Sequence, residues 1–324
     1  MENSEFHIYV HPDQKQEICP QRLDGDMSVF EGFKYEVQWL FYLHLRDRFP
    51  GLQKNADYPE KGIFLIHKSN VWKFDWNPDL FVVSAQWDHP RDDRAQVHLV
   101  ANKYKATDGA LSFFERITGV GFQYCTCPIM HPVITPRCEE RGDRLENVVF
   151  MGNPKNLDPA FRTDEFSKSV ENLGMKFIIV DDPHKHSDFS EVDVAMAVRE
   201  IGRVVNNKPA VKLYNSWRGK VPALLGCEVG FREVRENEYD YIEVDSVQEV
   251  LDALVKLRDN PEFRSKMIEN AEERGKPYLM EAQQQRWVDV FEKTIIPYYE
   301  EWIKTPRFVR RCFLAKRWVR YQFR

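Results

Sequence analysis

Strand-length apolar runs that alternate with segments of helical spacing are the feature that most constrains how this 324-residue chain can fold. In the first half, apolar residues recur at helical spacing from Phe30 to Phe49, and Pro50 and Gly51 close the segment. Strands are predicted around it at 6–10, 62–66, 79–85 and 96–101. Short runs of this kind, rich in β-branched and aromatic residues, are typical of buried parallel sheets.

The same pattern begins again after a proline-containing stretch at 127–142, which is predicted to be a linker. Strands of the second half are predicted at 147–152, 175–181, 193–198, 222–226 and 241–244. Helices are predicted at 163–173, 212–219, 246–258, 261–275 and 281–302. The sequence therefore predicts an α/β protein with two Rossmann-like, doubly wound domains, over residues 1–140 and 141–304. Since right-handed crossovers put all strand ends on one side of a sheet, the domains are expected to face a central cleft.

Composition limits the class of protein. Hydrophobic residues make up 43% of the chain and charged residues 30%, the balance of a water-soluble globular protein. No apolar run approaches the ~20 residues of a membrane helix, and the acidic start MENSEFHIYV is unlike a secretory signal. Of six cysteines only Cys125 and Cys127 lie close together, which is a weak metal pattern and is more typical of reduced thiols. We therefore expect a cytoplasmic protein.

The most informative segment is NKPAVKLYNSWRGKVPALLGCEVGFRE, which begins at Asn207. Lys208 and Lys212 flank the start of a predicted helix, where free N–H groups and the positive end of the helix dipole attract phosphate. Glu228 follows the next predicted strand, so its carboxylate can accept hydrogen bonds from two hydroxyls of a ribose or hexose. The pattern predicts a nucleotide-diphosphate site without a Walker loop or a GxGxxG turn.

This segment and the helical stretch after it resemble the C-terminal domain of GT-B glycosyltransferases. The resemblance is to a bacterial group that carries K-P-x-x-K-L-x-N-A-W-x-A-G-V-P-A-I-L-G-P-E. It covers roughly residues 141–290, and the N-terminal half is similar only in outline. The resemblance implies that the donor is bound by Arg199, Lys208, Lys212, Asn215, Ser216 and Glu228.

One departure from the family pattern leaves the stereochemistry of transfer open. Retaining GT-B enzymes often carry two glutamates separated by seven residues, and the resemblance puts Asn207 and Asn215 at those places. Retention and inversion are therefore both compatible with the sequence. A non-catalytic GT-B-like binding or scaffold protein and a phosphate-binding epimerase of the same fold are the alternative functions.

Polar side chains that follow strands of the first half are candidates for the acceptor side. His67 follows GIFLI, Asp88 and His89 follow DLFVVSA, and Asn102 follows QVHLVA. An inverting enzyme needs a base that works near neutral pH, so His67 is the first catalytic candidate and Asp88 the second. Gly32, at the start of the first helix, would allow an acceptor to approach closely.

No carboxylate pattern suited to a metal ion is found in the sequence. Asp181 and Asp182 precede a proline, and Asp92 and Asp93 lie in a charged stretch that is predicted to be a loop. The sequence therefore predicts no metal ion and no other cofactor. Positive groups and the helix dipole would instead stabilise a departing diphosphate.

The C-terminal segment, residues 305–324, holds seven Lys and Arg residues and no acid, whereas the rest of the chain has more acidic than basic residues. A helical projection gathers Phe308, Cys312, Ala315, Val319 and Phe323 on one stripe, and Arg310, Arg317, Arg320 and Arg324 on the other side. This basic amphipathic helix is suited to an anionic membrane, or to packing on the first domain with Phe308, Val319 and Phe323 buried. The acidic body and the shortness of the basic patch argue against nucleic acid as a partner.

The predicted function is metal-independent, hexosyltransferase-type glycosyl transfer, as in polysaccharide biosynthesis. A sugar would pass from a nucleotide-diphosphate donor to a glycan or a lipid-linked acceptor. The predicted location is the cytoplasm, with attachment to the inner face of a membrane if the C-terminal helix binds lipid.

Overall fold

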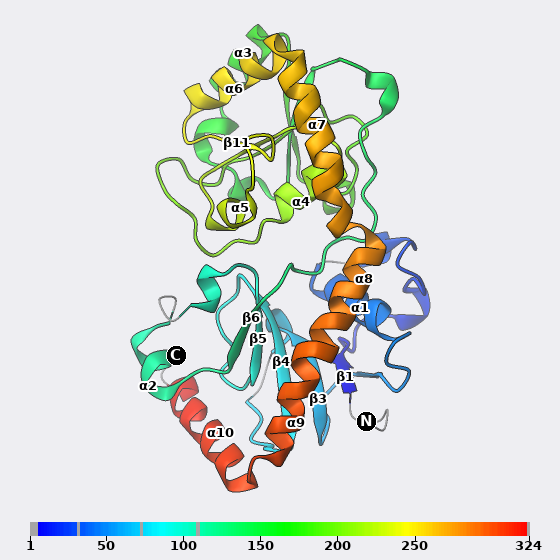
Figure 1. Cartoon of the computed structure of the whole chain (residues 1–324), viewed down its shortest axis with the longest axis vertical. Coiled ribbons are helices and arrows are strands. Elements are labelled where there is room, and N and C mark those ends of the chain that lie inside the picture. The colour runs from blue at the N-terminus through cyan, green and yellow to red at the C-terminus, as the bar shows by residue number, and fades with distance from the viewer. Residues whose placement is uncertain (1–5, 31–32, 72–73, 108–110, 323–324) are drawn as a thin grey trace. The chain divides into compact units, whose positions relative to one another are not determined.

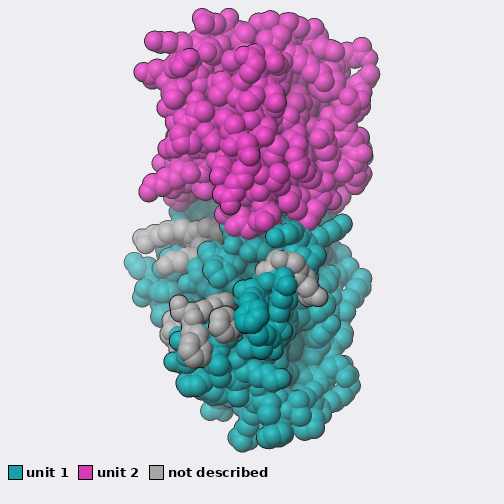
Figure 2. Space-filling model, turned by 90° about the vertical axis from the view of Figure 1, so that its left-hand side faces the viewer, with its two compact units in different colours: residues 1–130, 280–324 teal, residues 131–279 magenta. Residues whose placement is uncertain are grey.

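The structure, a computed structural model, describes residues 6–30, 33–71, 74–107 and 111–322. The chain forms two compact units, which Figure 2 distinguishes by colour. Unit 1 contains residues 1–130 and 280–324, and unit 2 contains residues 131–279. Gly32, named above as an acceptor-side candidate, lies outside the described residues.

Unit 1 is built on a six-stranded sheet in which neighbouring strands run parallel (Figure 1). In the order β2-β1-β3-β4-β5-β6, its strands are β2 (Gln53–Asn55), β1 (Phe6–Tyr9), β3 (Gly62–His67), β4 (Leu80–Trp87), β5 (Val97–Val100) and β6 (Phe122–Cys125). Its α-helices include α1 (Phe33–Leu45), α2 (Phe113–Thr118), α8 (Met280–Val290), α9 (Ile296–Lys304) and α10 (Arg307–Gln322). The central strands β3 and β4 are buried along their whole length.

Unit 2 is built on a five-stranded sheet that is also parallel. In the order β11-β10-β9-β7-β8, its strands are β11 (Ile242–Glu243), β10 (Ala223–Leu225), β9 (Val194–Ala197), β7 (Asn147–Met151) and β8 (Lys176–Val180). Its α-helices include α3 (Asp164–Asn172), α4 (Val211–Arg218), α5 (Val229–Val234), α6 (Val247–Asp259) and α7 (Pro261–Gly275). Side chains of Thr163, Ser246 and Asn260 cap the first turns of α3, α6 and α7.

The predicted fold class, two doubly wound parallel-sheet units, is confirmed, and each predicted strand is present. Two short strands were not predicted. β2 has the polar sequence QKN, and β6 has the half-exposed sequence FQYC, so neither carries the apolar run that marks a buried strand. The predicted cleft stays a prediction, because the structure defines each unit by itself.

The division of the chain differs from the predicted boundaries at 140 and 304. The helices α8 and α9 follow unit 2 in sequence but belong to unit 1. Trp287 and Phe291 lie in the core of the first sheet, and the rings of Trp287 and Phe41 of α1 pack edge to face at 4.7 Å. Helical periodicity predicts a helix and its apolar face, but it does not identify the sheet that this face covers.

The helix α10 packs on unit 1 with the face opposite to the predicted one. Leu314, Arg317 and Arg320 are buried, whereas Phe308 is 75% exposed and Val319 is 47% exposed. The prediction that Phe308 and Val319 would be buried is therefore wrong, and Phe323 lies outside the described residues. The reason is that unit 1 offers carboxylates to this helix rather than an apolar groove: Arg310 pairs with Asp79 and Arg320 with Asp93.

Within the described part of the chain, no helix has both the length and the apolar character that crossing a bilayer requires.

Candidate functional site

Arg199 and Glu228 meet at the carboxyl edge of the sheet of unit 2. They follow β9 and β10, which are neighbouring parallel strands with Ala197 opposite Leu225. Arg199 Nε lies 3.0 Å from Glu228 Oε1, and Glu228 is only 1% exposed. Ligands of open α/β sheets bind at this edge, so the pair lies where a substrate site is expected.

Backbone contacts hold Glu228 beside the segment that leads into α4. The Val205 N–H donates to Cys227 O at 2.8 Å, and the Val229 N–H donates to Val205 O at 2.8 Å. A Cβ at Gly230 would lie 2.4 Å from Lys208 O, so only glycine permits this close approach. The chain therefore brings Lys208 and Glu228 together through main-chain bonds and one obligatory glycine.

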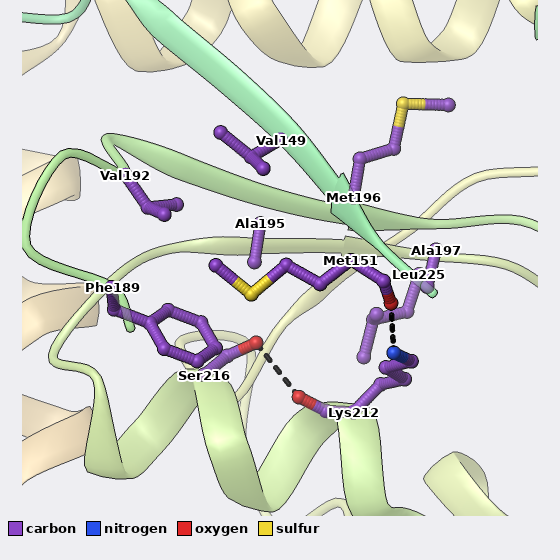
Figure 3. Close-up of a pocket in the computed structure, with 10 residues that line it drawn as sticks. All are labelled: Val149, Met151, Phe189, Val192, Ala195, Met196, Ala197, Lys212, Ser216 and Leu225. Atoms are coloured by element: carbon purple, nitrogen blue, oxygen red, sulfur yellow. Dashed lines mark hydrogen bonds between the residues drawn. The ribbon is translucent and has the colours of Figure 1, made fainter. Parts of the chain in front are cut away.

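Lys212, in the first turn of α4, extends to the end of β7. Its ammonium donates to Met151 O, a contact drawn in Figure 3. The next residue, Gly152, has a φ of +147°, and a Cβ there would lie 3.2 Å from Lys212 Nζ. Ala210, the N-cap of α4, offers no side-chain cap, so its first N–H groups are left for another acceptor.

The charges of three basic side chains affect the pKa of the Glu228 carboxyl group. Burial raises the pKa of Glu228, and Arg199, Lys208 and Lys212 oppose that shift. Burial and the charge of Arg199 lower the pKa of Lys212 to about 8, while Glu228 acts in the opposite direction. The cluster therefore has an excess of positive charge, which suits an anion such as a diphosphate.

Neither carboxylate oxygen of Glu228 has a hydrogen-bond partner among the described residues, although Arg199 Nε lies 3.0 Å from Oε1 in an ion pair. A buried carboxylate without hydrogen-bond donors lowers the stability of the protein. These oxygens are therefore suited to accept hydrogen bonds from hydroxyl groups of a ligand. Oδ1 of Asn215 is likewise buried without a partner in the described chain.

Ser216 is directed to the interior of unit 2 rather than to this cluster. Its hydroxyl donates to Lys212 O at 2.8 Å within the helix (Figure 3). It lines a cavity of about 20 Å³ together with Val149, Met151, Phe189, Val192, Ala195, Met196, Ala197, Lys212 and Leu225. That volume holds about one water molecule, so this cavity is too small for a nucleotide.

In unit 1, His67 and Asp88 lie at the carboxyl ends of the neighbouring strands β3 and β4. Nδ1 of His67 accepts from the Ser69 N–H at 3.2 Å and lies 2.6 Å from the Ser69 hydroxyl, so the ring proton is assigned to Nε2. Burial and the nearby His89 lower the pKa of His67 to about 4, and Asp88 opposes the shift. Asn102 accepts from the Lys105 N–H at 2.9 Å and so holds a local turn.

The sequence interpretation missed a pocket of about 470 Å³ at the carboxyl ends of β2, β1 and β3. It is lined by Tyr9, His11, Pro12, Ala56, Asp57, Ser69, Asn70 and Val71. The signal for His11 was present, because His11 directly follows the apolar run FHIYV. Asp57 follows β2, whose polar sequence gave no strand to place it on. The volume is in the usual range of small-molecule sites.

Among the described residues, no group of three or more His, Cys, Asp or Glu side chains is placed to hold a metal ion. Asp92 and Asp93 lie in a segment between β4 and β5, but they are buried rather than exposed. Asp92 pairs with Arg94 and Asp93 with Arg320. Both carboxylates are therefore parts of ion pairs within unit 1.

In comparison with solved structures, the two parallel-sheet units match the GT-B fold, the fold of many glycosyltransferases. The structure is similar to that of the pneumococcal O-GlcNAc transferase GtfA in complex with UDP and GlcNAc, with a TM-score of 0.52 and 8% identity over 82% of this chain and 61% of that chain. It is also similar to WaaG, a glycosyltransferase involved in lipopolysaccharide biosynthesis, with a TM-score of 0.46 and 11% identity over 89% of this chain and 99% of that chain. No protein family and no curated protein matches the sequence.

This chain thus spans about three fifths of the pneumococcal transferase. At such low identity the likeness shows the fold, and function has to be argued from the site residues.

Proposed function

We propose that this protein is a glycosyltransferase that moves a sugar from a nucleoside-diphosphate donor to a glycan or a lipid-linked acceptor. The observation that carries the proposal is the group of Arg199, Lys208 and Lys212 around the buried Glu228 at the carboxyl edge of the second sheet. Two kinds of ligand chemistry fit this group at once. The excess positive charge suits a diphosphate, and the unfilled oxygens of Glu228 suit hydroxyls of a ribose or hexose.

The donor bond that breaks joins the anomeric carbon of the sugar to a phosphate oxygen, and negative charge develops on the departing diphosphate. Arg199, Lys208, Lys212 and the uncapped first turn of α4 would stabilise that charge. This arrangement supplies the positive charge that a metal ion would otherwise supply. We therefore include metal independence in the proposal.

The acceptor would be bound by the carboxyl edge of the first sheet, in the pocket lined by Tyr9, His11 and Asp57. His67 would hold Ser69 at the wall of this pocket, because its Nδ1 accepts from both polar groups of Ser69. Asp88 and His11 are then the candidates to accept the acceptor proton, and Asp13 lies 3.4 Å from His11 Nδ1. The proposal covers retention and inversion alike.

Nucleotide binding and turnover test the proposal directly. The protein is expected to be stabilised by one of UDP, GDP, ADP and dTDP in a thermal-shift screen, since ligand at 100 times its Kd adds about 2.7 kcal/mol. Lys208→Ala should lose this stabilisation, whereas Lys168→Ala, which changes an exposed lysine of α3, should keep it. Release of nucleotide from the matching sugar donor should continue in EDTA.

Other results would change the assignment. Binding without release of nucleotide from any donor would identify a GT-B-like binding protein, the alternative that the asparagines at 207 and 215 leave open. Conversion of the donor without an acceptor to an isomeric sugar nucleotide would identify an epimerase. Loss of turnover in EDTA that Mg²⁺ or Mn²⁺ restores would disprove metal independence.

The pH dependence of nucleotide binding tests the role of Lys212. Because the pKa of Lys212 is about 8, its side chain carries a positive charge below pH 8 and loses that charge above it. A bound diphosphate favours the charged form, so affinity should be constant below pH 8 and should fall above it, by up to tenfold per pH unit. Calorimetric titrations between pH 7 and pH 9.5 measure this, and Lys212→Arg, which stays charged, should flatten the profile. An equal fall in both proteins would mean that another group titrates.

A further inference from the structure

The outward face of α10 is apolar although the helix is rich in arginine. Phe308 and Val319 point away from unit 1, and Ala315 lies exposed between them on the same stripe. Trp318 borders the stripe, and its ring lies 5.5 Å from the ring of the exposed Trp76. An amphipathic helix that packs on a protein normally turns its apolar stripe toward the protein core. In α10 this stripe is turned toward solvent.

Ion pairs on the inward face fix this orientation. Arg307 and Arg310 bind Asp79 at 2.7 and 3.0 Å, and Arg310 also donates to Pro78 O at 2.8 Å. At the other end of the helix Arg320 pairs with Asp93 and donates to Gly119 O at 2.9 Å. Rotation of the apolar stripe toward unit 1 would break these contacts, so the stripe is held outward.

A second apolar element lies beside α10. The C-terminal part of α10 contacts α2, as Figure 1 shows. Phe113 and Ile117 of α2 are 72% and 65% exposed. We call the exposed apolar side chains of these two contacting helices (Phe308, Ala315 and Val319 of α10, with Phe113 and Ile117 of α2) the α10–α2 face.

The charge of this face is positive. Arg311 and Lys316 of α10 and Arg116 of α2 are exposed, and none of them forms an ion pair with the described residues. The segment 305–324 contains no acid, and Glu115 of α2 is buried against Arg91. Apolar and aromatic side chains bordered by lysine and arginine complement the anionic interface of a lipid bilayer.

We propose that the α10–α2 face binds an anionic membrane, with Phe308, Val319, Phe113 and Ile117 in the interfacial layer and Arg116, Arg311 and Lys316 at the headgroups. This inference goes beyond glycosyl transfer and does not depend on it. It also changes the mode of attachment predicted from the sequence. Arg307, Arg310 and Arg320 hold the helix to the protein instead of to lipid, so apolar insertion provides most of the binding and salt weakens it only in part.

Co-sedimentation of the full chain with vesicles tests this proposal. Binding is expected to be stronger to vesicles of phosphatidylcholine mixed with phosphatidylglycerol than to vesicles of phosphatidylcholine alone. Phe308→Ser/Val319→Ser should lower the partition coefficient at least tenfold, with thermal unfolding unchanged because both side chains are exposed. Arg311→Glu/Lys316→Glu should also lower it. Ile178→Ser, which removes an exposed apolar side chain from β8 of unit 2, should leave binding as in the parent protein.

Three results would overturn the proposal. One is absence of binding to either kind of vesicle, and another is equal binding to both. The third is unchanged binding after the Phe308→Ser/Val319→Ser double substitution. Sedimentation velocity without lipid completes the test: if the parent protein self-associates and the double variant is monomeric, the face is an interface between copies of this chain, and the membrane proposal is rejected.

Discussion

Replacement of Glu228 by glutamine is expected to weaken the binding of the matching nucleoside diphosphate by about 1.5–3 kcal/mol, the range for hydrogen bonds to charged groups. The carboxylate is buried, and no described residue donates a hydrogen bond to either of its oxygens. Donors from a ribose or hexose would fill these positions. Glutamine keeps the shape of the side chain but removes the charge and replaces one acceptor with a donor, so both hydroxyl bonds are weakened.

A comparison with pyrophosphate separates this role from a general electrostatic effect. Loss of the negative charge beside Arg199, Lys208 and Lys212 should leave the affinity for pyrophosphate unchanged or increase it, because the three cations remain. Isothermal titration with both ligands measures the difference. Glu171→Gln, a change at an exposed position of α3, is the matched control. If Glu228→Gln weakens both ligands equally, the carboxylate does not contact the sugar part of the donor.

The second sheet and the grouping of four charged residues at its carboxyl edge could be predicted because their signals are local. Arg199, Lys208, Lys212 and Glu228 lie within 30 residues of one another in the sequence, at the ends of consecutive strands and at one helix start. Parallel topology then brings strand ends to one edge without further information. The position of Ser216 was not predictable in this way, since one residue along a helix changes the direction of a side chain by about 100°.

The pocket at the carboxyl ends of β2, β1 and β3 was missed because it depends on three strand ends that are far apart in sequence. Its walls come from the segments after β1, β2 and β3, and β2 has no apolar run. The pattern of each strand taken alone points to His67 but does not distinguish His11. The contacts of His67 with Ser69 became visible only in three dimensions.

The face of α10 was predicted incorrectly for a different reason. Helical periodicity separates Phe308 and Val319 from Arg317 and Arg320, but the partner surface decides which face is buried. Asp93 contributes to that surface, although the sequence predicts only that it lies in a charged loop. An apolar stripe can therefore face outward when the body of the protein offers carboxylates to the opposite side.

Substitution of Asp93 by alanine is expected to destabilise unit 1 by about 3–5 kcal/mol, the cost of leaving one partner of a buried ion pair uncompensated. Asp93 and Arg320 are 2% and 4% exposed, so water cannot readily replace the lost carboxylate. Arg317 lies close by, and burial together with Arg320 lowers the pKa of Arg317 to about 9, whereas Asp93 acts in the opposite direction. Without Asp93, two buried arginines would repel each other.

Asp79 provides the contrast for this prediction, because it also pairs with α10 but is accessible to solvent. Asp79→Ala should cost no more than about 1 kcal/mol, as is usual for exposed ion pairs. Urea denaturation followed by circular dichroism measures both variants. The double variant Asp93→Leu/Arg320→Met should recover most of the loss, since an apolar pair of similar volume often replaces a buried ion pair without penalty. If Asp93→Ala is no more destabilising than Asp79→Ala, Arg320 is hydrated and α10 does not pack through its arginine face.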